Sequence, residues 1–170
     1  MMYLQSGQFD RIYEAYCSRV YAYFSSCFGS DWAEDCTQQT FLKIWKAMNR
    51  PGFFPPYRWN AWIFRIAVNV KNDCLRDKLK RGETVSYLEI DQPSEEISEK
   101  RLLEQEAVSG ALSALKEEER EVLLLKYNGL KSAEIGRMMG ISASAARSRL
   151  AAAKDRFRGN LIKRGVDPDE

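Results

Sequence analysis

The chain has 170 residues, 45% of them apolar and 12% aromatic, so it is apolar enough for packed cores and wholesale disorder is excluded. It contains no histidine, glycine-rich phosphate loop, nucleophile elbow or metal-ligand spacing, so we expect no enzymatic activity, no cofactor and no bound metal. The net charge is only +2, and no run approaches the roughly 18 apolar residues that a membrane span requires. We therefore expect a cytoplasmic protein that does not insert into membranes.

The four cysteines, Cys17, Cys27, Cys36 and Cys74, show no CxxC pairing. Without histidine, a zinc site would need all four thiolates from scattered helices. The prediction is therefore four unpaired, mostly buried thiols in a reducing compartment.

Glycine and proline are sparse, 10 and 5 residues, and long strand-like alternations are missing, so the predicted fold is all-α. Between Gly82 and Glu106 there are eight acids and two bases, a net charge of −6, which leaves +8 for the rest of the chain. This distribution predicts two small helical domains, residues 1–81 and 102–170, joined by a flexible acidic linker over residues 82–101.

The first helix is predicted over Phe9–Cys27 from apolar residues spaced by three and four. Asp31 is a candidate cap for a second helix, which ends near the stop signal Asn49–Gly52. One side of this second helix is expected to be buried, through the residues Ala33, Thr37, Phe41, Ile44 and Met48.

A second strip of the same helix is polar and mostly uncharged: Asp35, Gln38, Gln39 and Leu42 follow one another at helical spacing. Amide side chains offer donors and acceptors but contribute little to folding a surface helix. The strip therefore suits a docking surface for another protein. A merely solvated helix face is the alternative that periodicity alone leaves open.

The loop Gly52–Trp59 is rich in aromatic residues and proline, and cannot be helical. Its rings, Phe53, Phe54, Tyr57 and Trp59, stand beside Arg58, a combination that can stack on unpaired bases. The alternative is that Phe53, Phe54 and Trp59 pack into the helical core.

The third helix, Asn60–Arg81, has a predicted buried side and a polar side. The buried side comprises Trp62, Ile63, Ile66, Ala67 and Val70, and the side chains expected to project include Arg65, Asn69, Lys71, Asn72, Asp73 and Arg76. The polar side with its excess of cations fits contacts to phosphates and bases, although a solvated basic face is the commoner case.

In the second domain, a helix over Glu99–Leu115 is predicted to turn Leu102, Leu103, Val108, Leu112 and Leu115 toward the core. The apolar run Val122–Leu125 is expected at the centre of this domain.

The segment Lys131–Leu150 fits a helix-turn-helix, with Gly136 where two helices touch, Gly140 in the turn and Ser142 as the N-cap of the second helix. Nine cations against two anions between Lys131 and Arg164 favour DNA binding. The side chains that could reach phosphates or guanine edges are Ser142, Ser144, Arg147, Ser148, Arg149 and Lys154.

Three stretches resemble the sigma-70 family of initiation factors, of the extracytoplasmic-function (ECF) type. The pattern at Asp35, Gln38, Phe41, Leu42, Ile44 and Trp45 resembles region 2.2, residues 58–69 resemble regions 2.3 and 2.4, and residues 111–125 with the helix-turn-helix resemble region 4. Two positions in region 4 depart from the family pattern: Lys116 replaces a usual proline, and Ala146 a common β-branched residue. The loop Pro51–Tyr57 departs as well, since it is more aromatic than usual and carries Pro55 and Pro56.

The resemblance implies that Asp35, Gln38, Gln39 and Leu42 bind the β′ coiled coil of core RNA polymerase, while the second domain meets the β flap. It also implies −35 recognition by the helix-turn-helix and an anti-sigma partner. The residues that it implies for contacts to the −10 promoter DNA are Phe53, Phe54, Tyr57, Arg58, Trp59, Asn69, Asp73 and Arg76. The alternative is a two-domain helix-turn-helix regulator that binds an operator as a dimer.

Overall fold

The computed structural model describes residues 2–28, 30–83 and 99–168. Within these residues the chain forms seven helices and no strand, so the predicted all-α fold is confirmed. The chain divides into two compact units, Met1–Glu89 and Ile90–Glu170. Most of the predicted acidic linker lies outside the described residues.

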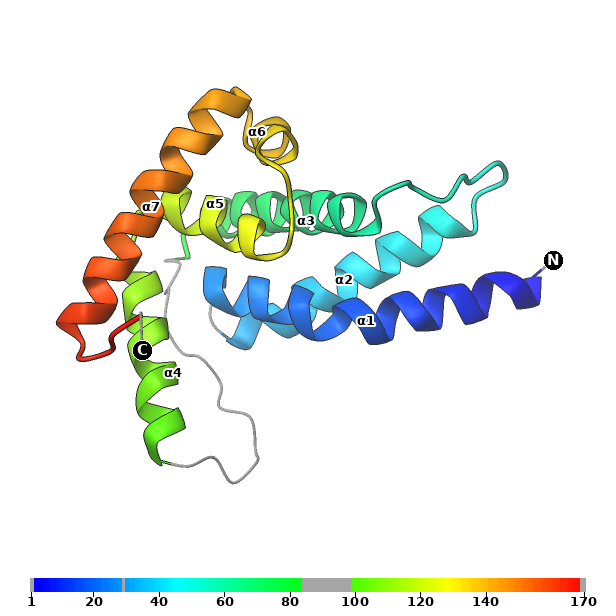
Figure 1. Ribbon diagram of the computed structural model, residues 1–170. Helices are drawn as coiled ribbons and strands as arrows, with labels where there is room; N and C mark the ends of the chain where they lie inside the picture. Colours follow the sequence, from blue (N-terminus) through cyan, green and yellow to red (C-terminus); the bar gives the residue numbers. More distant parts are fainter. Residues whose placement is uncertain (1, 29, 84–98, 169–170) are drawn as a thin grey trace. The chain divides into compact units, whose positions relative to one another are not determined.

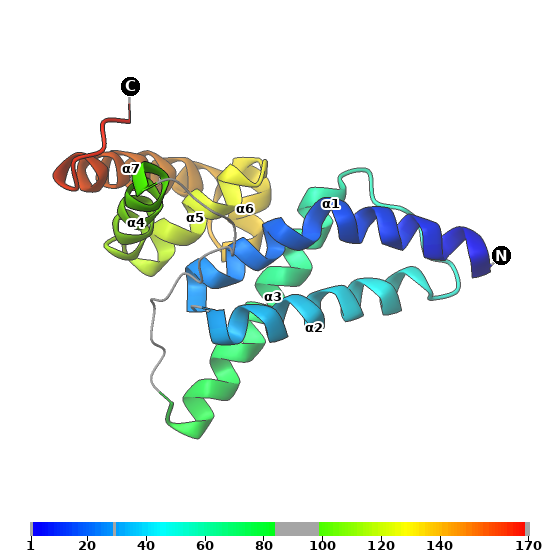
Figure 2. The same cartoon turned by 90° about the horizontal axis from the view of Figure 1, so that it is seen from below.

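The first unit consists of α1 (Met2–Phe28), α2 (Ser30–Met48) and α3 (Trp59–Arg81). Helices α1 and α2 lie side by side, and α3 crosses them (Figures 1 and 2). The prediction that Asp31 precedes and caps the second helix is wrong, because α2 already begins at Ser30. A capping residue needs non-helical backbone, and Asp31 is helical.

The core of the first unit is built from large side chains of all three helices. Tyr23 and Phe24 of α1, Ile44 and Met48 of α2 and Phe64 of α3 are fully buried. The Tyr23 and Phe64 rings meet edge to face, with centroids 5.8 Å apart. All five residues of α2 that were predicted to face inward are buried.

Helix α3 buries more of its circumference than its sequence indicates. Lys71, which was expected to project, is only 3% exposed, and Lys78 is buried as well. The reason is that α3 packs against both α1 and α2, so residues outside the single apolar stripe are also covered. The long alkyl stem of lysine tolerates such a position when its ammonium group is accommodated.

The second unit consists of α4 (Glu99–Ser113), α5 (Glu117–Tyr127), α6 (Ser132–Met139) and α7 (Ala143–Lys163). Helix α7 packs against each of the other three. Val122 and Leu125 of the central apolar run are fully buried, whereas Leu123 and Leu124 are partly exposed.

The predicted inward face of α4 is partly wrong. Leu103 and Val108 are exposed, while Leu115, just after α4, is buried as predicted. Within the described part of α4 itself, the buried positions are Ala107 and Ala111. Small alanine side chains let α4 lie close against α7, and this packing rotates the two larger residues outward.

Polar side chains hold the helix ends of the second unit. Buried Arg120 donates hydrogen bonds to the carbonyl oxygens of Leu112, Ser113 and Leu115, where α4 ends, at 3.0, 3.3 and 3.1 Å. The backbone N–H of Lys116 donates to the Glu119 carboxylate at the start of α5. Lysine at this position therefore supplies a donor that proline lacks.

In residues 2–28, 30–83 and 99–168, no helix combines the length with the apolar character that crossing a bilayer requires. The same residues contain no group of three or more histidine, cysteine, aspartate and glutamate side chains placed to hold a metal ion.

Candidate functional site

Helix α2 has two contrasting sides. Asp35, Gln38, Gln39 and Leu42 are all exposed, while the opposite side of the helix is buried. Leu42 is 51% exposed, a large apolar side chain open to solvent at the end of a polar strip. The four residues predicted to form a docking strip therefore share one accessible surface.

Trp45 extends this surface and was not included in the predicted docking strip. It lies three residues after Leu42, one helical turn further on, and is 48% exposed. The spacing from Leu42 was the available signal for its position. We refer to Asp35, Gln38, Gln39, Leu42 and Trp45 as the α2 strip.

The aromatic loop before α3 divides into inward and outward rings. The Phe53 ring lies 6.4 Å from Trp59 and 5.8 Å from Trp62, and the two tryptophans meet edge to face at 5.6 Å. Phe54 is 90% exposed, and Tyr57 is fully exposed. Phe53 and Trp59 therefore pack against each other and against Trp62 but stay partly exposed, so neither belongs to the core, and Arg58 beside them is partly exposed as well.

On α3, Asn69, Asp73 and Arg76 follow one another at helical spacing and form one accessible strip. The Asp73 carboxylate accepts from Lys43 of α2 at 3.1 Å and from Arg76 at 3.3 Å. The Lys43 contact joins two helices across thirty residues of sequence and was not predicted. Because all three side chains are about half exposed or more, these ion pairs contribute about 1 kcal/mol or less.

The turn between α6 and α7 has the predicted construction. Gly140 adopts φ +67°, a conformation that favours glycine. A Cβ atom on Gly136 would lie 2.7 Å from the Ile141 carbonyl oxygen, so α6 meets the backbone of the turn before α7, rather than α7 itself, at a point where only glycine fits. Ser142 caps α7, because its Oγ accepts from the Ala145 N–H at 3.0 Å.

The outward face of α7 begins directly after this cap. Ser144, Arg147 and Ser148 are exposed, whereas Ala146 and Leu150 are buried against the rest of the unit. Lys154, further along the helix, is exposed too. Arg149 differs, since its guanidinium pairs with the Glu118 carboxylate at 3.3 Å and its side chain is 28% exposed.

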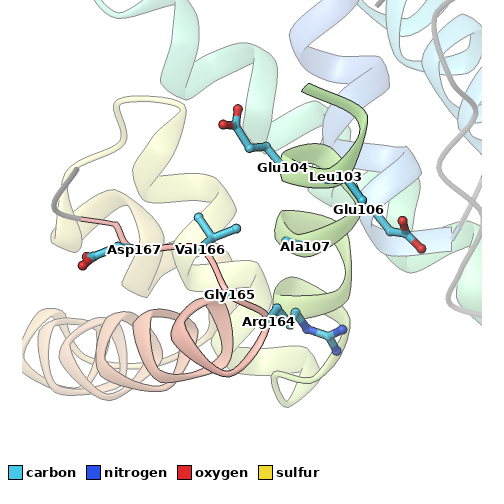
Figure 3. A pocket seen from close by; sticks show the side chains of 8 residues that line it. All are labelled: Leu103, Glu104, Glu106, Ala107, Arg164, Gly165, Val166 and Asp167. Carbon is cyan, nitrogen blue, oxygen red and sulfur yellow. The ribbon is translucent and has the colours of Figure 1, made fainter. Parts of the chain in front are cut away.

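A hollow of about 760 Å³ lies in the second unit between α4 and the segment after α7 (Figure 3). Its Arg164 donates to the Gly110 carbonyl oxygen at 3.0 Å, while Glu104 and Glu106 point in different directions. The polar groups of this lining do not converge on a common point, as those of a ligand site would.

Similarity to known proteins identifies the family of this chain. A model described as sigma-70 region 2 matches residues 12–81, and a model described as sigma-70 region 4 matches residues 105–157. RNA polymerase sigma factor CarQ of Myxococcus xanthus is 32% identical over 133 residues, which cover 74% of this chain and 72% of that protein. The chain belongs to the sigma-70 family.

Two further relatives are similar to this sigma factor. ECF RNA polymerase sigma factor SigE of Mycolicibacterium smegmatis is 27% identical, over 91% of this chain and 62% of that protein. Probable RNA polymerase sigma factor RfaY of Xanthomonas campestris is 32% identical, over 78% of this chain, and the match spans only 34% of that longer protein. The predicted family and its ECF type are confirmed.

A solved structure supports the fold of this sigma factor. RpoE of Bartonella quintana, crystallised with the anti-sigma factor NepR, superposes with a TM-score of 0.73 at 20% identity, covering 91% of this chain and 97% of that one. The alternative of a dimeric operator-binding regulator is not favoured, because region 2 occupies the part of the chain where that regulator would hold an effector or dimerisation domain.

Proposed function

We propose that this sigma factor binds core RNA polymerase and directs promoter-specific initiation, with its first unit on the −10 element and its second on the −35 element. The observation that carries the proposal is the α2 strip, where Leu42 and Trp45 stay exposed beside Asp35, Gln38 and Gln39. Large apolar side chains in a polar rim are typical of protein interfaces. In this proposal the strip binds the β′ coiled coil.

The −10 role rests on the aromatic loop and on α3. Phe54 and Tyr57 can stack on unpaired DNA bases, because their rings are almost fully exposed. The contacts among Phe53, Trp59 and Trp62 support the loop that carries these two rings. Arg58, Asn69 and Arg76 then supply donors for the DNA backbone and base edges. Asp73 positions Lys43 and Arg76 through its two ion pairs.

The −35 role rests on α7. A capped helix N-terminus with exposed Ser144, Arg147 and Ser148 fits the major groove, in which serine and arginine contact phosphates and guanine edges. Lys154 lies further along α7 as a phosphate contact. Arg149 joins them only when DNA phosphate replaces its contact with Glu118.

Two further partners belong to the proposal. The second unit would meet the β flap of polymerase, and an anti-sigma protein would hold the factor inactive. The latter is supported by the Bartonella quintana relative, which is crystallised with such a protein.

The test is run-off transcription with core polymerase and a promoter library. The double variant Asp35→Ala plus Gln38→Ala is expected to lower promoter-dependent transcripts at least tenfold by weakening binding to core. Its matched control is Gln8→Ala plus Glu14→Ala, an exposed amide and carboxylate on α1, which should transcribe normally.

Binding of the −35 duplex, measured separately, should be the same for both double variants. Transcripts that persist in the α2 double variant, or operator binding by the wild type without any effect on core polymerase, would overturn the proposal.

A further inference from the structure

Two cysteine thiols meet in the interior of the first unit. The sulfur atoms of Cys36 on α2 and Cys74 on α3 are 3.1 Å apart, although 38 residues separate them in the chain. Both are buried: Cys36 is 0% exposed and Cys74 is 7% exposed. A disulfide needs its two sulfur atoms about 2.05 Å apart, so small side-chain rotations would bring this pair to bonding distance.

A buried cation stands close to the pair. The Lys78 ammonium lies 3.7 Å from the centre of the Trp32 ring and 5.8 Å from that of Phe28, so cation–π contacts fix its position. Lys78 follows Cys74 by one helical turn. Burial raises the pKa of Cys36, and the positive charge of Lys78 opposes that effect only in part.

From this cluster we propose that Cys36 and Cys74 form a peroxide-responsive disulfide that links α2 to α3. This is a modification site independent of the polymerase and DNA surfaces, although it joins the helices that carry them. The reduced form is the one that the structure shows.

The chemistry requires one peroxide as the two-electron oxidant. The sulfur of Cys74, the less deeply buried of the two residues, attacks a peroxide oxygen; the O–O bond breaks, the departing hydroxide takes up the Cys74 thiol proton and leaves as water, and Cys74 becomes a sulfenic acid. The Cys36 sulfur then attacks the Cys74 sulfur, the S–O bond breaks, and a second water carries away the Cys36 proton. Two thiols are oxidised to one disulfide, and one peroxide is reduced to two waters.

The assignment of roles follows from burial. Burial, and next the hydrogen bond with Cys74, raise the pKa of the Cys36 thiol, which outweighs the opposing effect of Lys78. Cys36 therefore stays protonated at neutral pH and reacts slowly with peroxide itself. It serves as the resolving thiol, already in contact with the sulfur that it attacks.

The experiment treats the reduced full-length protein with hydrogen peroxide, alkylates remaining thiols under denaturing conditions, and maps the digest by mass spectrometry. The expected product is a peptide pair linked through Cys36 and Cys74, released by dithiothreitol. The crosslink closes a 38-residue separation, so the thermal midpoint of the first unit should rise by about 10 °C on oxidation. Tryptophan fluorescence reports it, because all four tryptophans lie in this unit.

Cys74→Ala should abolish both the linked peptide and the rise in the midpoint, while the control Cys17→Ala, at a more exposed thiol on α1, should retain both. If a cysteine variant fails to fold, the wild-type peptide map and midpoint still decide. The proposal would be overturned if no crosslink formed or if the crosslinks involved Cys17 or Cys27 instead. It would also be overturned if the thermal midpoint were unchanged or lower after oxidation.

Discussion

Arg120 is expected to contribute strongly to the stability of the second unit. Its guanidinium binds three carbonyl oxygens at the end of α4: that of Leu115 in a buried position, and those of Leu112 and Ser113 in partly buried ones. A hydrogen bond that involves a charged group contributes about 1.5–3 kcal/mol when buried. Water can partly replace the two partly buried bonds, so Arg120→Met should cost about 3–4 kcal/mol.

That cost is large, because a unit of this size has a free energy of unfolding of only about 5–10 kcal/mol. The matched control is Arg137→Met, since Arg137 is an exposed arginine of the same unit with one hydrogen bond to its own helix. The free energy of unfolding of this control should fall by about 0.5 kcal/mol or less.

Urea titration separates the two units. Circular dichroism follows both, whereas tryptophan fluorescence follows only the first, which contains all four tryptophans. Arg120→Met should shift the dichroism transition of the second unit and leave the fluorescence transition unchanged. Unfolding of Arg120→Met and Arg137→Met at the same urea concentration would show that the three Arg120 hydrogen bonds do not stabilise the unit.

Three further pairs of substitutions test local features. Gly136→Ala should destabilise the second unit by about 1–3 kcal/mol in urea titration, because the new Cβ would meet the Ile141 carbonyl oxygen. Gly159→Ala, at a helical site with open space around it, should instead stabilise the unit by about 0.5–1 kcal/mol. Equal effects of the two substitutions would contradict the close contact at Gly136. Ser142→Ala should cost about 1 kcal/mol through loss of the α7 cap, whereas Ser142→Asn should keep the cap; a neutral Ser142→Ala would show that the cap is not needed. In thermal unfolding, Phe53→Ala should lower the stability of the first unit by about 1–2 kcal/mol, and Phe54→Ala by less than 0.5 kcal/mol. Phe54→Ala should nevertheless reduce promoter opening. A larger loss of stability in Phe54→Ala than in Phe53→Ala would contradict the division of the loop into inward and outward rings.

The features that follow from local spacing were predictable. The buried side of α2 and its polar strip, the Gly140 turn and the Ser142 cap all depend on residues within one or two helical turns of each other. Helical periodicity and capping preferences act over that range, so the sequence alone carries them.

The features that join distant segments needed the tertiary structure. Lys71 is buried because α3 packs against two helices at once. Leu103 is exposed because α4 packs against α7 through its alanines, on another side of the helix. Nothing in the spacing of the aromatic loop distinguishes Phe53, which reaches Trp62, from Phe54, which does not.

The helical class, the helix-turn-helix and the docking strip of α2 apart from Trp45 could be predicted from the sequence, because these arise from the 3.6-residue period and from local backbone preferences. The contacts of Cys36 with Cys74 beside Lys78, and of Lys43 with Asp73, became apparent only from the packing of the helices. Such pairs depend on how helices are oriented when their cores interlock, and no local spacing records that orientation.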